Sequence, residues 1–392
     1  MSGSRLPIWL ILPVGNKHGW GVCGKYLALE MSRSLPVNLI TEDIKQIRKE
    51  DSPMDRELSK IQVPFHHLED SAQHSETHHL EGPVLQTIAG AHLKPWFIHV
   101  RAPRVIGYTF FEKASLNRQD ILWAKQYYDW IAAGSTWCEK ILKNFDVMNS
   151  STIIQGVDTG LFHEGYAEKQ TYRDFFVVFS GGKLELRKGQ DLVIRAFKVL
   201  QDRHPDTLLV NSWYNMWDES LLTMRHSPYI VFDMPKGDYV TAVRRLLFAN
   251  GIDPKRVVVL RPMPHKHMGA IYGDTDCGLF PNRCEGGTNL VLMEYMACGK
   301  PAIASLSSGH KDILTKDNCI PIQSMGKFEI FDPKGNLIEQ WDNPDLEEII
   351  ESLEWAYHNR DAIKQVGHVA AASMSRHTWQ VAAKKFIELL TN

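Results

Sequence analysis

The chain has 392 residues, more than one ordinary domain needs and enough for two. Its 44% of hydrophobic residues is typical of a soluble globular protein, and with a net charge of −2 nothing in the composition argues for bulk binding to nucleic acid. The apolar run at residues 8–12 is too short to span a bilayer, whereas peripheral attachment to a membrane is compatible with this sequence.

The cysteines are few and scattered, and no two of them form a C-x-x-C pair. They are Cys23, Cys138, Cys277, Cys284, Cys298 and Cys319. A long chain with this pattern is typical of a reducing compartment rather than of a disulfide scaffold. We therefore expect a cytoplasmic protein.

The first 41 residues have the pattern of a βαβ unit. Strands are expected at residues 6–14 and 37–41, with a helix at residues 22–34 between them. Gly19, Gly21 and Gly24 form a literal G-x-G-x-x-G, and Glu42 and Asp43 follow near the distance expected for a ribose-binding acid. This pattern suggests a dinucleotide site. However, four residues separate the strand from the motif, which weakens that interpretation.

Residues 42–83 are polar and irregular, and we expect a surface loop there. The histidines in it are His66, His67, His74, His78 and His79. None has a helical partner at i+4 together with a third ligand, so the sequence predicts no metal site in this segment.

Strands and helices alternate through the rest of the chain, which predicts parallel sheets in two α/β domains. Expected strands lie at residues 97–100, 105–110, 130–133, 152–154, 175–179, 208–210, 229–232, 257–260, 277–280 and 302–305. Expected helices lie at residues 117–127, from Ser135 on, and at residues 191–200 and 240–249. Residues 327–341 read as an inserted hairpin, and the chain is helical after Pro344. Domain boundaries are expected at residues 165 and 375, with residues 376–392 packing back on the first domain.

The stretch from Cys284 to Pro301 carries the strongest functional signal. It follows a buried strand, begins with a glycine-rich loop that contains Glu285, and continues as a helix that contains Glu294. Gly299 and Pro301 end this helix. A loop between a strand's carboxyl end and a helix's amino end is where open α/β sheets bind ligands and anions.

This arrangement resembles the donor site of retaining glycosyltransferases with the GT-B architecture, in which two Rossmann-like domains face each other across a cleft. Eight residues separate Glu285 from Glu294, one more than is usual in that family. Gly182-Lys183-Leu184 with Lys188-Gly189 resembles the family's phosphate loop, with Lys183 in place of an arginine. Gly156-Val157-Asp158 and Trp379 resemble further family features.

The resemblance implies a role for each of these residues. Lys183, Lys188, Glu285 and His99 are expected to be catalytic, the lysines at the diphosphate and the other two at the donor sugar. The expected donor-binding residues are Gly19, Gly21, Gly182, Gly286, Gly287, Thr288, Asn289, Leu290 and Glu294. The first domain (1–165) would bind the acceptor and the second (166–375) the nucleotide sugar, with residues 262–267 near the base.

The function implied is that of a retaining hexosyltransferase. The donor would be UDP- or GDP-linked and the acceptor a saccharide, a lipid-linked molecule or a protein. No cofactor and no metal are expected, because Asp274-Thr275-Asp276 directly precedes a buried strand and reads as its cap. Three alternatives stay open: an NAD-dependent oxidoreductase using the Gly19-Gly21-Gly24 motif, a non-catalytic glycan-binding protein, and a sugar-nucleotide epimerase.

Overall fold

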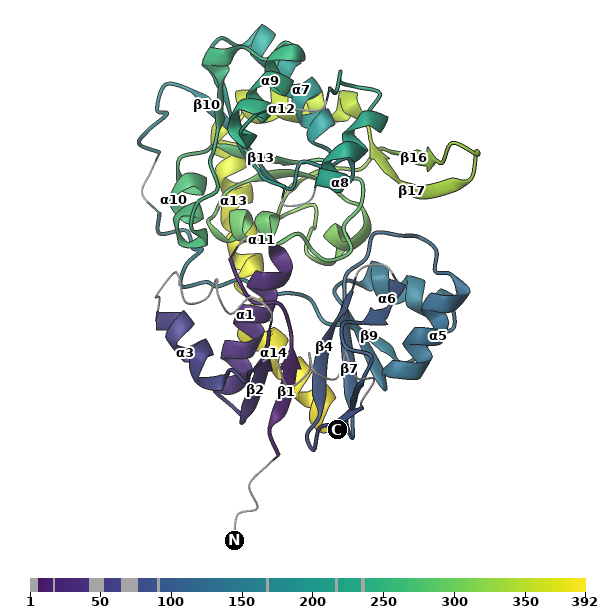
Figure 1. Cartoon of the computed structure of the whole chain (residues 1–392). Coiled ribbons are helices and arrows are strands. Elements are labelled where there is room, and N and C mark those ends of the chain that lie inside the picture. The colour runs from purple at the N-terminus through teal and green to yellow at the C-terminus, as the bar shows by residue number, and fades with distance from the viewer. Residues whose placement is uncertain are drawn as a thin grey trace. The chain divides into compact units, whose positions relative to one another are not determined.

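The computed structural model describes residues 6–16, 18–41, 53–64, 77–89, 92–166, 169–215, 218–233 and 237–392. Glu42, Asp43, His66, His67 and His74 lie outside these residues. The chain divides into two units. Figure 1 colours them by residue number, from purple at the N-terminus to yellow at the C-terminus. The N-terminal unit consists of Met1–Gly156 and His377–Asn392, and the C-terminal unit is Val157–Arg376. The sequence-based boundary at residue 165 lies inside the C-terminal unit.

A parallel sheet of order β2-β1-β4-β7-β8-β9 forms the centre of the N-terminal unit. Its strands are β1 (Ile8–Ile11), β2 (Val37–Ile40), β4 (Val84–Ala89), β7 (Val105–Thr109), β8 (Trp130–Ala133) and β9 (Ser150–Thr152). The short β5 (Lys94–Pro95) pairs antiparallel with β4, and β3 (His78–His79) pairs with β6 (Val100–Arg101) in a separate ribbon. Strands that alternate with helices pair in parallel, which is the arrangement expected from the sequence.

Among its described residues, this unit has the helices α1 (Gly19–Ser32), α3 (Pro53–Ile61), α5 (Arg118–Tyr127), α6 (Thr136–Asn144) and α14 (Trp379–Thr391). The side chains of Asn117 and Ser135 cap α5 and α6, as the sequence suggested for Ser135. Helix α3 corrects the expectation of an irregular loop at residues 42–83. It begins at Pro53, a favourable first helical residue, and buries Leu58 against the unit.

Helix α14 returns to the N-terminal unit and packs on α1. The rings of Trp379 and Tyr26 stack with centroids 5.4 Å apart and planes within 2° of parallel. Gly156 lies flush against the start of α14, where a Cβ atom would lie 2.2 Å from the backbone nitrogen of Trp379. The chain can make this close contact only because Gly156 has no side chain.

The C-terminal unit contains a six-stranded parallel sheet of order β12-β11-β10-β13-β14-β15. The strands are β10 (Phe176–Gly182), β11 (Thr207–Trp213), β12 (Val257–Val259), β13 (Cys277–Phe280), β14 (Ala302–Ser305) and β15 (Ile320–Ile322). The central strands β13 and β14 are buried along their whole length, as in a sheet covered on both faces. This order is the doubly wound one, in which β10 and β13 are neighbours whose chains continue in opposite directions across the sheet.

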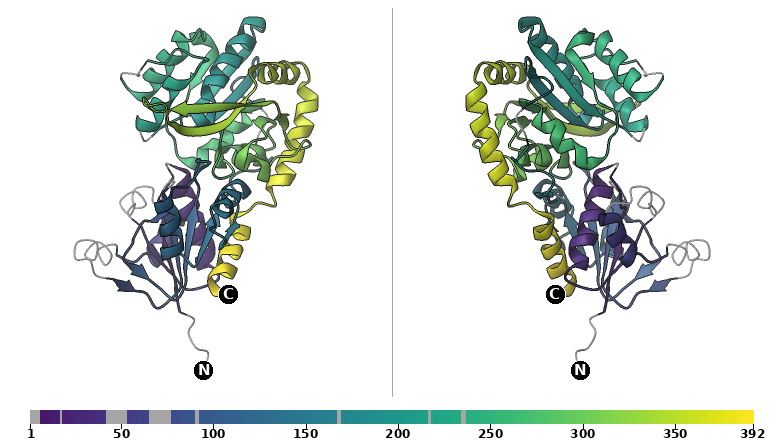
Figure 2. Two further views of the ribbon diagram at one scale, coloured as in Figure 1. Left: turned by 90° about the vertical axis from the view of Figure 1, so that its right-hand side faces the viewer. Right: turned by 90° about the vertical axis from the view of Figure 1, so that its left-hand side faces the viewer.

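The α-helices of the C-terminal unit are α7 (Gln190–Arg203), α8 (Asp218–Leu222), α9 (Tyr239–Ala249), α10 (Met268–Gly273), α11 (Leu290–Ala297), α12 (Leu346–His358) and α13 (Arg360–Met374). Short 3₁₀ turns include η2 (Leu186–Lys188), η3 (Thr223–His226), η4 (Pro254–Arg256), η5 (His265–His267) and η6 (Ser308–Asp312). Strands β16 (Met325–Phe331) and β17 (Leu337–Pro344) form the expected antiparallel hairpin, which extends from the unit to the right in Figure 1 and faces the viewer in the left view of Figure 2.

Residues 229–232, expected as a strand, form no strand in the structure. The side chain of Asn250 pairs with both backbone groups of Val231: its Oδ1 accepts from the Val231 nitrogen at 2.8 Å and its Nδ2 donates to the Val231 oxygen at 2.9 Å. The amide thus occupies the groups that a neighbouring strand would use. The apolar pattern instead reflects partial burial of Tyr229, Ile230 and Phe232 against the core.

A fully buried ion pair fixes the loop after β13 to helix α7. The guanidinium of Arg283 forms two parallel hydrogen bonds to Asp191, at 2.7 and 2.8 Å, and both side chains are 0% exposed. Arg283 also donates to the Leu186 carbonyl at 2.6 Å and to Asn343 at 3.0 Å. A two-pronged arginine–carboxylate contact has fixed geometry. It therefore sets the spacing of the loops at the carboxyl ends of β10 and β13.

Removal of one partner should leave the other charge buried without compensation. We expect Asp191→Ala to lower the free energy of unfolding of the C-terminal unit by about 3–5 kcal/mol, measured by urea denaturation. Asp202→Ala is the matched control, because Asp202 is an exposed acid on the same helix and pairs with Lys198 at the surface. Its effect should stay below about 0.5 kcal/mol. Equal losses in both variants would contradict the structural role of the buried pair.

Candidate functional site

Most of the residues that were selected from the sequence lie in the C-terminal unit, at or near the carboxyl ends of β10 and β13. In a doubly wound sheet, these neighbouring strands border the crevice where ligands bind, because the chain leaves them in opposite directions. The loop after β10 is Lys183–Gly189, and the loop after β13 runs from Pro281 to Asn289. Both lead into helices, α7 and α11, which are labelled with their strands in Figure 1.

Two glycines allow the loop after β10 to take its path. Gly182 has φ of +112° and Gly189 has φ of +74°, in a region that other residues rarely adopt. At Gly189, a Cβ atom would also lie 2.1 Å from the Pro281 carbonyl oxygen. The two loops can touch only because this position has no side chain.

Glu285 lies between cations that come from the other loop. One of its carboxylate oxygens is 2.6 Å from Lys188 Nζ and also accepts from the amide of Asn282, while the other is 3.3 Å from Arg187. Burial alone would raise the pKa of Glu285, but the charges of Lys188 and Arg187 outweigh it and lower that pKa to about 2. Glu285 is therefore ionised at any physiological pH.

Arg187 was not among the residues selected from the sequence. Its guanidinium lies 2.6 Å from Glu185, 3.3 Å from Glu285 and 3.2 Å from the Cys284 carbonyl. Lys183, which the sequence did select, lies farther out, 3.5 Å from Glu185 and about one-third exposed. The only sequence signal for Arg187 was its position beside Lys188. The site thus carries three cations and two carboxylates in two adjoining loops.

The backbone of the second loop is held by the segment that follows β14. Glu285 donates its N–H to Ser308 Oγ at 2.7 Å and accepts from the Gly309 N–H at 3.0 Å. A Cβ at Gly309 would lie 1.8 Å from the Gly287 carbonyl, so this close contact requires glycine. Gly286 and Gly287 lie in this loop, as expected, directly before the start of α11.

The residues at the start of α11 are buried and in unusual conformations. Thr288 is 0% exposed and Asn289 has φ of +63°, a value that few residues besides glycine and asparagine adopt readily. Asn289 caps the helix at Leu292, and Leu290 is the first residue of α11. Thr288, Asn289 and Leu290 thus lie at the amino-terminal end of a helix, where backbone N–H groups can bind an anion.

His310 fixes the orientation of Asn289. Its Nδ1 lies 3.1 Å from the Ser305 carbonyl and its Nε2 lies 3.3 Å from Asn289 Nδ2. A carbonyl only accepts and an amide nitrogen only donates, so His310 is neutral and carries its proton on Nδ1. Burial lowers its pKa to about 4. No signal in the sequence pointed to His310.

Glu294 contacts a second loop rather than the cation cluster. Its carboxylate is 2.7 Å from His265 Nε2, and both side chains are largely buried. His265 belongs to residues 262–267, the segment expected near the base, and its ring packs 5.1 Å from that of Phe162. The structure therefore brings together two acids with different partners: Glu285 with the cations, and Glu294 with a histidine.

The other selected residues belong to the N-terminal unit. Gly19 is the first residue of α1, and the Gly21 N–H donates to His18 Nδ1 at 3.0 Å. A Cβ at Gly24 would lie 2.1 Å from the Pro13 carbonyl, so this glycine is needed for packing of α1 on the preceding loop. His99 lies in a turn that precedes β6, and its carbonyl accepts from the His78 N–H at 2.8 Å. It is thus in a segment that enters β7, not in a loop that follows a strand of the sheet.

The Asp-x-Asp sequence has a structural role. Asp276 accepts from the Val177 N–H at 2.7 Å and from Lys169 at 2.6 Å, and Asp274 accepts from the Gln170 N–H at 2.6 Å. These bonds tie the entry of β13 to the segment before β10, in agreement with its interpretation as a strand-entry cap.

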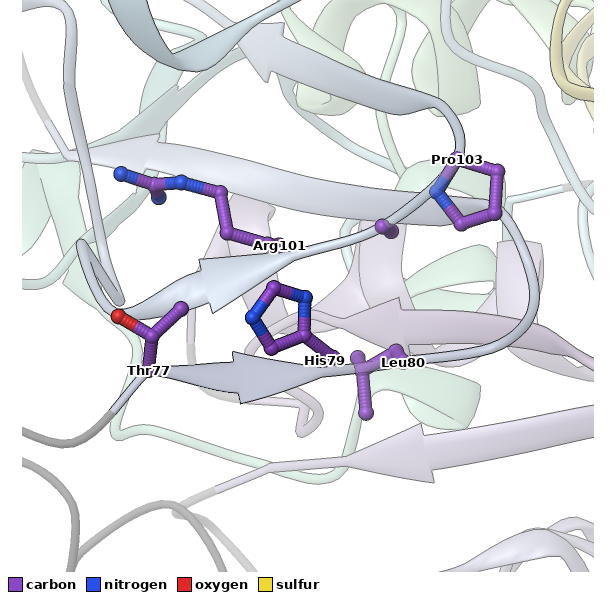
Figure 3. A pocket seen from close by; sticks show the side chains of 6 residues that line it. Thr77, His79, Leu80, Arg101 and Pro103 are labelled. Carbon is purple, nitrogen blue, oxygen red and sulfur yellow. The ribbon is translucent and has the colours of Figure 1, made fainter.

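A cavity also lies beside the β3–β6 ribbon of the N-terminal unit (Figure 3). Thr77, His79, Leu80, Arg101, Ala102 and Pro103 line it. Arg101 hydrogen-bonds to the carbonyls of Ile98 and Val100 with the same guanidinium nitrogen. None of the residues selected from the sequence as catalytic or donor-binding lines this cavity.

The neutral state of buried His310 should make stability depend on pH. Because its pKa is about 4 in the folded state and about 6.5 in the unfolded state, unfolding takes up a proton between these values. The stabilisation is present above pH 6.5 and is lost as pH falls towards 4, by at most roughly 3 kcal/mol. We expect His310→Gln to flatten the slope of unfolding free energy against pH in this window. His226→Gln, at an exposed histidine, should leave the slope unchanged; two equal slopes for His310→Gln and the parent would contradict the assignment.

Part of the chain is similar to known proteins in sequence. Residues 175–328 match the family model described as "Glycosyl transferases group 1". A segment of 166 residues is 28% identical to a GDP-mannose-dependent alpha-(1-6)-phosphatidylinositol monomannoside mannosyltransferase of Mycolicibacterium smegmatis. That match covers 39% of this chain and 37% of the relative.

Solved structures resemble the chain over almost its whole length. Sucrose-phosphate synthase from Thermosynechococcus elongatus has a TM-score of 0.66 at 13% identity, with 98% of each chain covered. A glycosyltransferase from Rickettsia africae has a TM-score of 0.63 at 12% identity, covering 98% of this chain and 97% of that one. Anabaena HepE, solved with UDP and glucose, has a TM-score of 0.61 at 12% identity, covering 99% of this chain and all of that one.

At these identities the structural matches show the fold, which is the expected α/β fold with parallel sheets. Within the described parts of the chain, no helix has the length and apolar character needed to cross a bilayer. The family match covers the segment that carries both site loops, Lys183–Gly189 and Pro281–Asn289. Residues 175–328 therefore match the glycosyl transferases group 1 family, and the chain as a whole has an α/β fold with parallel sheets that matches glycosyltransferase structures of the GT-B architecture.

Proposed function

We propose that this protein transfers a sugar from a nucleotide diphosphate sugar to an acceptor hydroxyl, with retention of anomeric configuration. The observation that carries the proposal is the contact between two loops, one after β10 and one after β13, at the carboxyl ends of the two strands where the direction of the sheet's strand order reverses. One loop supplies cations and the other an acid followed by glycines at a helix start, with Lys188 Nζ 2.6 Å from Glu285. A charged leaving group and a hydroxyl-rich sugar require these two kinds of partner.

In this proposal the cations neutralise the diphosphate. Lys188 and Arg187 are both largely buried, with side chains 10% and 12% exposed, so their charges are less screened than those of surface residues. Glu285 holds Lys188 in place and retains capacity to accept from a sugar hydroxyl, because a carboxylate accepts about four hydrogen bonds. Lys183 lies at the outer edge of the cluster, where it would meet the distal part of the diphosphate.

Glu294 would bind the ribose. Its carboxylate is largely buried, faces the loop of His265, and offers a second oxygen besides the one that pairs with the imidazole. The N–H groups near Gly287, Thr288 and Asn289 would bind phosphate or sugar oxygens at the start of α11. Ribose recognition would thus depend on helix α11 and the loop of His265, and charge neutralisation on the loop after β10.

The donor sugar proposed first is GDP-mannose, because the mannosyltransferase relative is named as dependent on it. UDP-linked sugars are the second choice, since the structural neighbour HepE was solved with UDP and with UDP-glucose. The acceptor hydroxyl would belong to a saccharide, a lipid-linked molecule or a protein. The leaving phosphate would take the acceptor proton, so no separate protein base is required.

The oxidoreductase alternative is not favoured. The glycine pattern at Gly19, Gly21 and Gly24 has a packing explanation, because α1 lies against residues 13–15 at backbone distance. The side chain of His18 also occupies one of the first amides of this helix. A dinucleotide site would need those groups open towards the pyrophosphate.

A donor panel tests the function. The protein would be incubated with an acceptor mixture and with GDP-mannose, UDP-glucose, UDP-N-acetylglucosamine or NADH, each in EDTA, and scored by nucleotide release and by the shift in melting temperature. Release of nucleoside diphosphate from one donor, with an α-linked product from an α-linked donor, is the expected result. Stabilisation by NADH alone would favour the oxidoreductase, and donor binding without turnover would favour a glycan-binding protein. Activity restored only by Mg²⁺ or Mn²⁺ would contradict metal independence.

Loss of the Glu294 carboxylate should weaken nucleotide binding. We expect Glu294→Gln to reduce the affinity for the cognate nucleoside diphosphate by roughly 1.5–3 kcal/mol, the value of a hydrogen bond to a charged group, measured by calorimetry. Glu347→Gln, at an exposed acid on α12, is the control and should bind as the parent does. Unchanged affinity of Glu294→Gln for every nucleotide of the panel would rule out the ribose assignment.

Loss of Lys188 should slow the chemical step more than it weakens binding. Negative charge grows on the diphosphate as the glycosidic bond breaks, so a fixed cation acts most strongly in the transition state. Lys188→Ala should lower kcat about 10²- to 10³-fold, with a smaller change in KM. Lys183→Arg, which restores the residue usual in the family, should retain parental activity. Parental turnover in both Lys188→Ala and Lys183→Ala would place the diphosphate elsewhere.

A further inference from the structure

Three potential metal ligands meet where helices α7 and α12 pack together, far from the donor loops. Glu354 and His358 are four residues apart on α12 and so share one face of that helix. His204 is the residue that follows α7. One ligand atom from each of the three lies within 4.8 Å of the others. The two helices are labelled side by side in Figure 1.

The distances between these atoms are close to those of a metal site. His204 Nε2 lies 2.7 Å from Glu354 Oε2, and His358 Nε2 lies 3.8 Å from the same oxygen. In a tetrahedral zinc site with bonds of about 2.0–2.1 Å, ligand atoms lie about 3.3 Å apart. The two measured distances lie on either side of this value. Small rotations of the side chains would therefore bring all three atoms into coordination distance.

Neighbouring groups already orient two of the ligands. Arg203 donates to Glu354 Oε1 at 2.9 Å, which leaves Oε2 directed at the histidines. The ring of His204 stacks on Tyr357 with centroids 3.9 Å apart, and Tyr357 donates to Asp206 at 2.6 Å. Partners that fix the orientation of ligands in this way raise the affinity of metal sites.

The local charges permit a divalent cation. The cations near the cluster are Arg203 and Arg360, and the acids are Glu354 and Asp206, with Arg360 already paired to Asp206 at 3.1 Å. The cluster is thus electrically balanced before a metal binds. Two imidazole nitrogens and one carboxylate oxygen form a ligand set of intermediate softness, which suits Zn²⁺ better than Mg²⁺ or Ca²⁺, because those two ions prefer oxygen ligands.

We propose that His204, Glu354 and His358 form a binding site for Zn²⁺ or a similar transition-metal ion, with water as the fourth ligand. His358 is 63% exposed, so the site is open to solvent on its side. Helix α7 has 14 residues and is thus about 21 Å long, and it separates His204 from the loop Lys183–Gly189. The metal therefore joins two helices of the C-terminal unit and takes no part in sugar transfer.

The test is titration of EDTA-stripped, dialysed protein with ZnCl₂ at pH 7.5, followed by calorimetry and by melting temperature. His358→Ala is the main variant because this ligand is exposed and its removal leaves the core unchanged; Glu354→Gln is the second. The controls are His226→Ala and Glu351→Gln, at an exposed histidine and an exposed acid of the same unit. The histidines outside this cluster are common to the parent and to both ligand variants, so their binding cancels in that comparison.

The parent and both controls should bind one more equivalent of Zn²⁺ than the ligand variants His358→Ala and Glu354→Gln do, or should bind Zn²⁺ at least tenfold more tightly. Their melting temperature should rise when Zn²⁺ binds. Without metal, His358→Ala should melt with the parent. Co²⁺ in place of Zn²⁺ should give the visible absorption of a tetrahedral ion only where all three ligands are present. If both ligand variants bind as many equivalents, with the same affinity and the same thermal shift, the site does not exist.

Discussion

The buried pair of Arg283 and Asp191 is the constraint on which the arrangement of the site depends. Arg283 lies in the loop after β13 and Asp191 in the first turn of α7, and neither side chain is exposed to water. Desolvation makes such a pair costly, and it persists only where the geometry and extra hydrogen bonds compensate. Here Leu186 and Asn343 provide those bonds. The pair therefore specifies the loop spacing more than it adds to stability.

The electrostatics of the site follow from that spacing. Once the loops touch at Gly189 and Pro281, Lys188 and Arg187 lie against Glu285, and three charges share a volume with little solvent. The charges of Lys188 and Arg187 keep Glu285 ionised, so the charged cluster exists before any ligand binds. A phosphate that enters would meet cations already oriented, which lowers the reorganisation required during reaction. Glu294, paired with His265, remains electrically separate from this cluster.

The sequence predicted the parts of this structure that depend on local pattern. Strand β13, helix α11 and strand β14 lie where short apolar runs and the Gly299–Pro301 stop placed them. Residues whose role depends on distant partners were not predictable. His310 is defined by Asn289 and Ser305, and Arg187 by an acid almost one hundred residues away. The expected strand at residues 229–232 failed for the same reason, because Asn250 satisfies the backbone there.

The return of α14 to the N-terminal unit has a consequence for synthesis of the chain. Because His377–Asn392 belongs to the same unit as Met1–Gly156, the C-terminal unit is an insertion within the other. A ribosome completes Val157–Arg376 before it makes the helix that stacks Trp379 on Tyr26. Domains generally fold as units during translation, with the earlier one first. In this chain the last step runs in the opposite order. The N-terminal unit begins first but is completed only after the inserted C-terminal unit has been made. Until then, α14 is not available to pack on the surface of α1 around Tyr26.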